Sequence, residues 1–257
     1  MGSHEINKKY YTKYWNDNMI HYLSHSAGVR WFDHLFKSML NELPEKYVRS
    51  VADIGCGLGL KTATMAKHFP NAKVHGYDFS KPGIDAAKRK FKDLQNLHFA
   101  TKDITASKTK EKYDLITGFD LLEHIEDWEG LTKKLIEANN RYMLISSPVG
   151  RMRPYEVHIG HVRNFKKGEI EEFMESQGYK TLKTFYAGFP FHSPILRNLT
   201  NRFYNEYAEL PQKEMSFLSK RMHDVWYFLF RYLSFKNKGD IFVGLFENAS
   251  TEPVRNS

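Results

Sequence analysis

The 257-residue chain has very little cysteine and no long hydrophobic run. Its only cysteine is Cys56, so no disulfide can form within the chain. No apolar run is long enough to span a bilayer, and the polar residues 1–9 are unlike a secretory signal peptide. These absences lead us to expect a cytoplasmic protein in a reducing compartment. Internal repeats and low-complexity tracts are also lacking.

The chain has no compact block of Lys or Arg, although it is basic overall. It contains 38 Lys and Arg against 30 Asp and Glu, a formal net charge of +8. Nucleic acid, an anionic membrane surface or a phosphorylated substrate would each fit this charge, and so would simple solubility. The charge therefore selects no partner. A hydrophobic content of 41% supports a sizeable core.

The most informative stretch is VADIGCGLG at 51–59. It is typical of a buried strand that enters a glycine-rich turn, with a helix following at 60–69. Glycines at alternate positions allow the backbone to approach a ligand where a Cβ atom would collide. A dinucleotide-binding turn requires glycine where Leu60 stands, and Asp53 would repel a pyrophosphate. A ligand with positive charge suits this turn better, and Cys56 is expected to be a small turn residue rather than a nucleophile.

Three further predicted strands end close to acidic residues. The strands at 73–78, 97–101 and 113–118 end at or just before the pairs Asp78–Phe79, Asp103–Ile104 and Phe119–Asp120. A single acid after a strand is commonly a turn residue or a helix cap. Four strand ends with this order and spacing form a much more specific pattern.

Together these segments resemble the class I S-adenosylmethionine (SAM) methyltransferases over about residues 50–186, with a return at 240–248. The resemblance implies that SAM is the cofactor. It also implies that Asp78 accepts hydrogen bonds from the ribose, Phe79 lies against the adenine ring, and Asp103 accepts from the adenine amino group. The residues expected at the cofactor are Tyr11, Asp53, Gly55, Cys56, Gly57, Gly59, Asp78, Phe79, Asp103, Ile104, Phe119 and Asp120.

The fold implied is α/β and Rossmann-like, with a seven-stranded, mostly parallel sheet and helices on both faces. Further strands are expected near 50–55, 141–147 and 179–186, and further helices near 83–92, 127–139 and 167–177. The expected divisions are an N-terminal helical cap at 1–45 over the sheet edge and the cofactor mouth, a SAM-binding core at 46–187, a helical lid at 188–239, a final strand at 240–248 and a disordered tail at 249–257.

The lid is inserted between the last two strands. The sixth strand runs parallel to the first in this family, so an insertion after it emerges over the ligand-binding face of the sheet. Within the lid, the segment 211–238 holds six Lys or Arg against two acids and an aromatic-rich apolar run. Such a segment can lie in a bilayer interface. The favoured interpretation is that its apolar face packs on the core of the lid or on a dimer partner.

Histidines on two loops are the candidate bases. His124 follows the fourth strand, and His158 and His161 lie in a long loop after the fifth, where the string Gly160–Phe165 reads G-H-x-R-x-F. Histidine titrates near neutral pH and is a natural general base. The string resembles a branch of bacterial methyltransferases from glycan and lipid assembly clusters. It makes His161 the first candidate and His124 the second, with His158 after them.

A divalent metal is a less favoured alternative. Asp120, Glu123 and His124 match the acid-x-x-Glu-His group of ubiquinone-type O-methyltransferases and of small-RNA 2′-O-methyltransferases, and His158 or His161 would complete the ligand set. Carboxylates with imidazole suit Mg²⁺, Mn²⁺ or Zn²⁺. The metal-binding families have Glu where this chain has Asp120, which counts against ligation.

The sequence thus predicts an enzyme that methylates a hydroxyl of a small or carrier-linked substrate, with sugars and lipid-linked glycans as the leading class. The second hypothesis is a metal-assisted RNA 2′-O-methyltransferase, although no RNA-binding module is evident and nucleic acid is not the expected partner. A non-catalytic scaffold with the same fold is the third. Peripheral membrane contact through 211–238 and a homodimer stay open.

Overall fold

The structure, a computed structural model, describes residues 7, 11–13, 15–104, 111–203, 215–235 and 237–251. Its centre is a seven-stranded sheet in the order β3-β2-β1-β4-β5-β7-β6. Strand β7 is antiparallel to both of its neighbours, and the other strand pairs are parallel. The strands are β1 (Ser50–Ile54), β2 (Lys73–Asp78), β3 (Leu97–Thr101), β4 (Tyr113–Phe119), β5 (Asn139–Pro148), β6 (Tyr179–Ala187) and β7 (Ile241–Asn248). The predicted fold class is confirmed.

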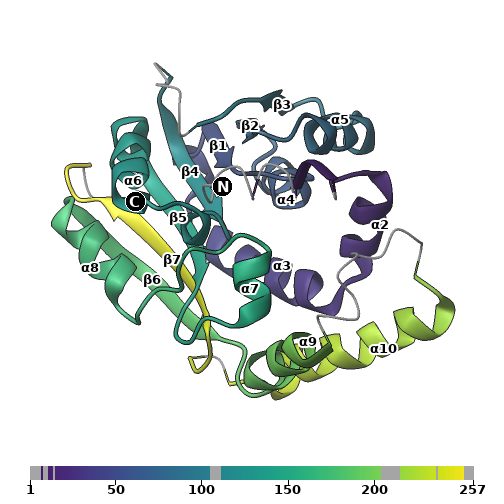
Figure 1. The fold of residues 1–257 in the computed structure, drawn as a ribbon. Helices are drawn as coiled ribbons and strands as arrows, with labels where there is room; N and C mark the ends of the chain where they lie inside the picture. The colour runs from purple at the N-terminus through teal and green to yellow at the C-terminus, as the bar shows by residue number, and fades with distance from the viewer. Residues whose placement is uncertain are drawn as a thin grey trace.

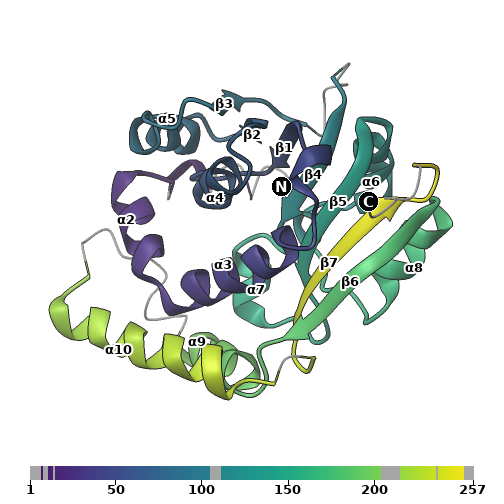
Figure 2. The ribbon, with the colours of Figure 1, turned by 180° about the vertical axis from the view of Figure 1, so that it is seen from behind.

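Helices cover both faces of this sheet (Figures 1 and 2). They are α2 (Asp17–His25), α3 (Ala27–Leu40), α4 (Leu60–His68), α5 (Lys81–Lys90), α6 (Trp128–Glu137), α7 (Pro154–His158), α8 (Glu169–Ser176), α9 (Arg197–Phe203) and α10 (Phe217–Phe228), with the shorter turns η1 (Glu45–Tyr47), η2 (Leu122–His124), η3 (Phe191–Leu196) and η5 (Leu229–Leu233). Phe36 of α3 and Met65 of α4 are buried on one face, and Leu131 of α6 and Met174 of α8 on the other. The sheet is therefore the middle of three layers.

Local sequence explains why the predicted helices form where they do. Ser80 caps α5 by accepting a hydrogen bond from the Gly83 amide, and Asp127 caps α6 in the same way through the Gly130 amide. The predictions for α4, α5, α6 and α8 agree with the structure to within two residues at each end. Helices α4, α5 and α6 come after the turns that follow β1, β2 and β4. They therefore hold these turns in place at the edge of the sheet where a ligand would bind.

Two expectations about the chain need correction. The long segment after β5 is not entirely a loop, because it contains the short helix α7, which Pro154 and Glu156 start. The N-terminal helix α3 covers a face of the sheet rather than its edge, since Phe32, Phe36 and Leu40 belong to the same buried cluster as residues of β4, β5 and β7. Residues 252–257 of the expected tail and most of residues 1–14 lie outside the described part of the chain.

The insertion between β6 and β7 contains the helical elements η3, α9, α10 and η5 in its described residues. Helix α10 runs beside α3 at the edge of the molecule (Figures 1 and 2). Arg30 of α3 pairs with Asp224 of α10 at 2.7 Å, and the Ala27 amide donates to Nδ1 of His223 at 3.2 Å. These contacts hold one side of α10 and leave its other side exposed.

The exposed side of α10 and η5 is apolar. Of the twelve exposed large hydrophobic residues found in the described part of the chain, eight lie between 217 and 235. All eight are more than half exposed: Phe217, Leu218, Met222, Val225, Phe228, Tyr232, Leu233 and Phe235. The segment therefore does not bury its apolar face in the core of the lid. Among the described helices, none is both long enough and apolar enough to cross a membrane.

Candidate active site

A cavity of about 670 Å³ opens at the carboxyl ends of β1, β2, β4 and β5. Most of the residues predicted for the cofactor line it, namely Tyr11, Asp53, Gly55, Cys56, Gly57, Asp78, Phe79, Asp103, Ile104, Phe119 and Asp120. Two of the three candidate bases, His124 and His161, line it as well. The structure therefore gathers into one cavity residues that lie more than a hundred positions apart in the chain.

The glycine turn after β1 has the backbone conformation that only glycine adopts without strain. Gly55, Gly57 and Gly59 have φ angles of 70°, 53° and 71°. A Cβ atom on Gly57 would lie 3.2 Å from the ring of Trp15. Gly59 does not line the cavity, and a Cβ atom there would lie 2.5 Å from Phe99. The first two glycines thus shape the cavity wall, and Gly59 allows close packing beneath it.

Two buried carboxylates flank the turn. Asp78 accepts hydrogen bonds from the amides of Gly57 and Ser80, both at 2.8 Å, and burial raises the pKa of its carboxyl group. Asp53 accepts from the hydroxyls of Thr62 at 2.6 Å and Thr117 at 2.8 Å. Burial raises the pKa of Asp53 to about 6, against the lowering effect of these two hydrogen bonds. The cavity wall beside the glycine turn therefore concentrates negative charge in a poorly solvated place.

Cys56 is a poor nucleophile in this setting. Burial, with Asp53 and Asp78 nearby, raises the pKa of the Cys56 thiol well above its usual range. A thiol reacts as the thiolate, which these neighbours disfavour. The expectation that Cys56 is a small turn residue agrees with this environment.

The rings of His124 and His161 pack against each other in the wall of the cavity. Their ring centroids lie 4.7 Å apart in an edge-to-face arrangement. The Nδ1 atom of His124 lies 3.1 Å from the carbonyl oxygen of Gly160, and because a carbonyl only accepts, Nδ1 carries the hydrogen. The Nε2 atom of His124 then accepts from the hydroxyl of Tyr11 at 3.3 Å. Burial lowers the pKa of His124 to about 3, so its ring is neutral at physiological pH.

Glu123 lies beside the two histidines and is fully buried. One carboxyl oxygen accepts from Ser147 at 3.0 Å, and the other has no hydrogen-bond partner among the described residues. Burial, with Asp120 nearby, raises the pKa of Glu123 well above its usual range. One ligand atom from each of Glu123, His124 and His161 lies within 4.8 Å of the others. Asp120, which the sequence adds to this candidate metal set, is not a member of the group.

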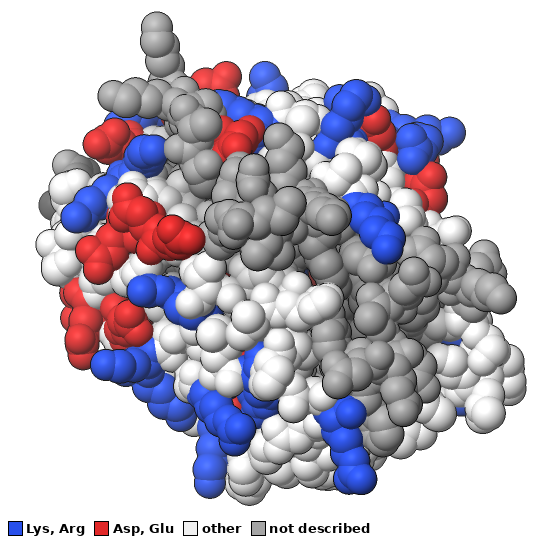
Figure 3. Space-filling view, in the orientation of Figure 1, with Lys and Arg blue, Asp and Glu red and all other residues white. Residues whose placement is uncertain are grey.

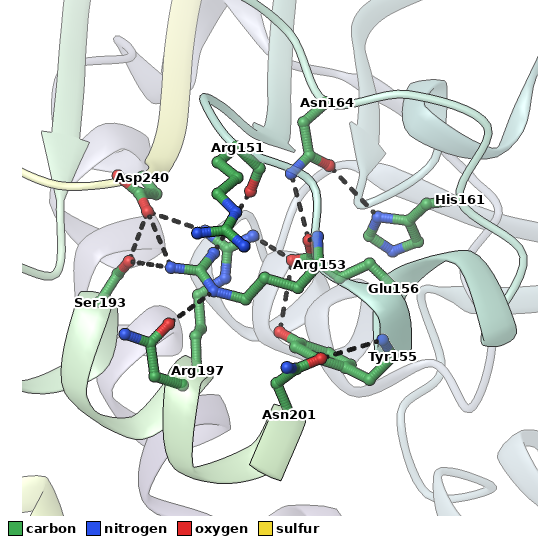
Figure 4. A network of polar contacts seen from close by, with 11 residues as sticks. Arg151, Arg153, Tyr155, Glu156, His161, Asn164, Ser193, Arg197, Asn201 and Asp240 are labelled. Atoms are coloured by element: carbon green, nitrogen blue, oxygen red, sulfur yellow. Dashed lines mark hydrogen bonds and ion pairs between the residues drawn. The ribbon is translucent and has the colours of Figure 1, made fainter. Parts of the chain in front are cut away.

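Figure 4 shows a polar network that reaches His161 from the inserted lid. Arg197 of α9 forms a buried ion pair with Glu156 of α7 and also contacts Asp240 at 3.3 Å. The side-chain amide of Asn164 donates to Glu156 at 3.3 Å, and its oxygen lies 3.5 Å from Nδ1 of His161. The lid and the segment after β5 are thus joined by charged groups that lie next to the candidate base.

Sequence reasoning missed part of the cavity wall. Tyr155, Glu156, His192 and Arg197 all line it, and no local motif distinguishes them. They come from α7, η3 and α9, which lie beside one another only in the folded chain. Conversely, His158 is exposed at the end of α7 and does not line the cavity.

The string G-H-x-R-x-F has an evident structural role. Gly160 has a φ of 94°, and a Cβ atom there would collide with Asn7. Arg163 lies over the ring of Trp128, and Phe165 is buried against the same indole at 5.1 Å. Gly160 and Phe165 therefore anchor the two ends of the segment that presents His161.

Comparison with known proteins identifies the class. A family model described as a methyltransferase domain matches residues 52–139. The malonyl-[acyl-carrier protein] O-methyltransferase of Acetivibrio thermocellus is 26% identical over 180 residues, which is 69% of this chain and 63% of that protein. The ubiquinone biosynthesis O-methyltransferase of Coxiella burnetii is 34% identical over 105 residues, 37% of this chain and 44% of that protein. The chain thus spans less than two thirds of the length of these relatives.

A solved structure agrees with the fold. The O-methyltransferase from a trans-AT PKS multienzyme of Brevibacillus brevis, in complex with S-adenosyl-L-homocysteine, has a TM-score of 0.57 and 18% identity, and covers 83% of this chain and 71% of that chain. The sheet and its helices therefore define a Rossmann-like methyltransferase fold. The chain carries a segment that matches a methyltransferase-domain model, and its fold agrees with the predicted resemblance to the class I, SAM-dependent methyltransferases.

Proposed function

We propose that this protein is a SAM-dependent enzyme that methylates a hydroxyl group of a small or carrier-linked substrate. The observation that carries the proposal is the single cavity that unites the glycine turn, Asp78 and Asp103 with His124 and His161. The residues fit the cofactor: Gly55 and Gly57 line the cavity without side chains, and the carboxylates supply acceptors for hydroxyl and amino groups. When bound, SAM supplies a methyl group that is already activated by its sulfonium.

His161 is the proposed general base. Carboxylate oxygens only accept hydrogen bonds, so the amide nitrogen of Asn164 faces Glu156 and its oxygen faces His161. The Nδ1 atom of His161 then carries the hydrogen, and Nε2 keeps the lone pair that would take the proton of an acceptor hydroxyl. Burial lowers the pKa of His161, while Glu156 opposes the shift. His124, with a pKa of about 3, is a weak base and serves better as a hydrogen-bond acceptor.

The remaining lining residues align the acceptor and exclude water, which is most of what a methyl transfer requires from a protein. Tyr155 of α7 and Arg197 of the lid both line the cavity. The O-methyltransferase relatives support oxygen as the acceptor atom. The malonyl-[acyl-carrier protein] relative favours a carrier-linked or acyl-type substrate, and the G-H-x-R-x-F string favours a sugar or lipid-linked glycan.

Calorimetric titration with SAM tests the cofactor assignment. We expect micromolar binding to the wild type and no measurable binding to Asp78→Ala, because the variant removes the buried acceptor beside the turn. Asp85→Ala is the matched control, since Asp85 lies exposed on α5 and pairs only with Lys81 in the described structure. Unchanged affinity in Asp78→Ala would refute the cofactor site.

Measurement of kcat tests the assignment of His161 as the general base. His161→Ala should lower kcat by about 10²- to 10⁴-fold, the usual contribution of general base catalysis, with little change in SAM affinity. His158→Ala should leave kcat unchanged, because His158 lies outside the cavity wall. Full activity of His161→Ala would remove that residue as the base.

A metal-assisted reaction is the second candidate, and the unpartnered oxygen of Glu123 favours it. A divalent cation held by Glu123, His124 and His161 would polarise an acceptor hydroxyl. Turnover abolished by a chelator and restored by Mg²⁺, Mn²⁺ or Zn²⁺ would establish this chemistry over the metal-free reaction. RNA as the acceptor has less support, because Lys and Arg are scattered among the described residues of the face in Figure 3, and acids gather over α8.

We further propose a peripheral contact between the 217–235 face and a membrane surface. Between 215 and 235 there are three bases, Lys220, Arg221 and Arg231, and one acid, Asp224, which is paired with Arg30. An apolar helix face flanked by bases binds anionic interfaces. Co-sedimentation with phosphatidylglycerol vesicles should be lost in Val225→Ser/Phe228→Ser and kept in Leu182→Ser. Dimerisation through the same face, seen by sedimentation velocity, would replace this proposal.

A further inference from the structure

A second cavity, of about 480 Å³, lies between α3, η3 and α10. It shares Val29, Lys61, Asp120, His192 and Ile241 with the first cavity, so the two adjoin beside the carboxyl end of β4. The rest of its wall is mostly apolar. We call it the acceptor-chain cavity and define it by Ala27, Gly28, Trp31, Phe32, Leu196, Met222, His223 and Trp226, together with the shared residues.

The acceptor-chain cavity opens towards the exposed face of α10. Met222 both lines the cavity and is 56% exposed, so the apolar wall continues onto the surface. Trp226 lies on the same helix and packs on Phe230, and Phe230 packs on Trp31 of α3. Apolar side chains of α3 and α10 therefore wall the cavity from the exposed Met222 inward to the residues that the two cavities share.

His192 is one of the polar residues at the junction of the two cavities. The Nδ1 atom of His192 is buried and has no hydrogen-bond partner among the described residues. The ring is held between Trp31, with centroids 5.1 Å apart, and Phe230, at 5.6 Å. His192 lines both cavities, so its imidazole can form a hydrogen bond with the hydroxyl of a molecule bound at their junction.

We propose that the acceptor-chain cavity holds the alkyl chain of an amphiphilic acceptor, with the hydroxyl-bearing end of that acceptor at His192. The chain enters from the exposed face of α10, and the polar end reaches the junction with the cofactor cavity. The assignment rests on the proposed function, since it specifies the acceptor of the same reaction. His192 is a positioning residue that orients the acceptor beside Asp120.

Gly28 provides a way to fill the cavity without disturbing the fold. It lies in the first turn of α3, and a Cβ atom built on it would meet no atom within 4 Å. Gly28→Leu therefore places a side chain in open space of the cavity. Gly28→Ala is the matched control, because it gives the same helical backbone with almost no added bulk.

The probes are butyl, hexyl and octyl glucosides below their micelle concentrations, with the fluorescence of Trp31 and Trp226 as the signal. Each added methylene should raise the affinity of the wild type and of Gly28→Ala about fourfold, the value expected for burying a CH₂ group. Gly28→Leu should bind octyl glucoside at least tenfold more weakly. His192→Phe, which keeps the ring packing, should lose two- to tenfold in affinity and keep the dependence on chain length.

The outcomes separate this inference from the proposed function. SAM binding with no dependence of glucoside affinity on chain length would overturn the acceptor-chain cavity and leave the methyltransferase assignment standing. Equal octyl glucoside affinity in wild type and Gly28→Leu, with loss in Val225→Ser/Phe228→Ser, would place the chain on the outer face and also overturn it. Chain-length-dependent binding in a protein that fails to bind SAM would overturn the acceptor role itself.

Discussion

The two halves of this active site are built in different ways. The cofactor half comes from consecutive strand ends between residues 50 and 120, where short motifs place a glycine turn and acids at one edge of the sheet. The acceptor half comes from α3, α7, η3, α9 and α10, which the chain brings together across more than a hundred positions. The first half depends on backbone geometry, and the second depends on side-chain contacts between distant elements. The family model accordingly matches residues 52–139 and none of the inserted lid.

The largest expected effect comes from breaking the buried ion pair of the acceptor half. Arg197 and Glu156 are both almost fully buried. Arg197→Met leaves the Glu156 carboxylate without its main partner and should lower the free energy of unfolding by about 3–5 kcal/mol. Urea unfolding at pH 7.5 measures this effect.

An exposed pair provides the matched control for Arg197. Arg89 and Asp17 lie 2.8 Å apart with about 60% of each side chain exposed. Arg89→Met should therefore change the free energy of unfolding by less than about 1 kcal/mol. Equal small losses in both variants would show that the network in Figure 4 does not hold the lid to α7.

A substitution of Asp53 in the cofactor half should have the next largest effect, and it should raise the free energy of unfolding rather than lower it. Burial raises the pKa of Asp53 from 3.8 to about 6 in the folded state. This raised pKa favours folding below about pH 4, and the advantage is lost as the pH rises through about 6. One pKa unit corresponds to about 1.4 kcal/mol, so the ionised carboxylate costs about 3 kcal/mol at pH 8.

Asp53→Asn removes this titration. Relative to wild type, the variant should gain about 2 kcal/mol of stability between pH 4.5 and pH 8, because part of the roughly 3 kcal/mol is already lost by wild type at pH 4.5; urea unfolding at both pH values measures the gain. Its SAM affinity should fall, because the negative charge beside the glycine turn is gone. A difference from wild type that does not change with pH would contradict the raised pKa of Asp53.

The contrast between the cofactor half and the acceptor half also explains how much of the molecule could be predicted from the sequence. The sequence places Asp53, Asp78, Gly55 and Gly57, which line the cavity, because strand period, turn chemistry and capping are local. His192 and Arg197 were missed, because nothing within ten residues of either marks a cavity. The apolar content of α10 is visible in the sequence, but the side that packs on α3 is fixed by contacts with Arg30 and His223, which the sequence does not reveal.

The smallest expected effect compares one glycine from each half. Gly57 has a positive φ and Trp15 close by, so Gly57→Ala should destabilise the fold by about 1 kcal/mol or more and weaken SAM binding. Gly28 lies in the first turn of α3, so Gly28→Ala should stabilise it by about 0.4–1 kcal/mol and leave SAM binding unchanged. Thermal unfolding with and without SAM distinguishes the two. If Gly28→Ala weakened SAM binding as much as Gly57→Ala does, the cofactor and acceptor halves could not be treated as separate sites, because a change in the wall of one would alter the ligand of the other.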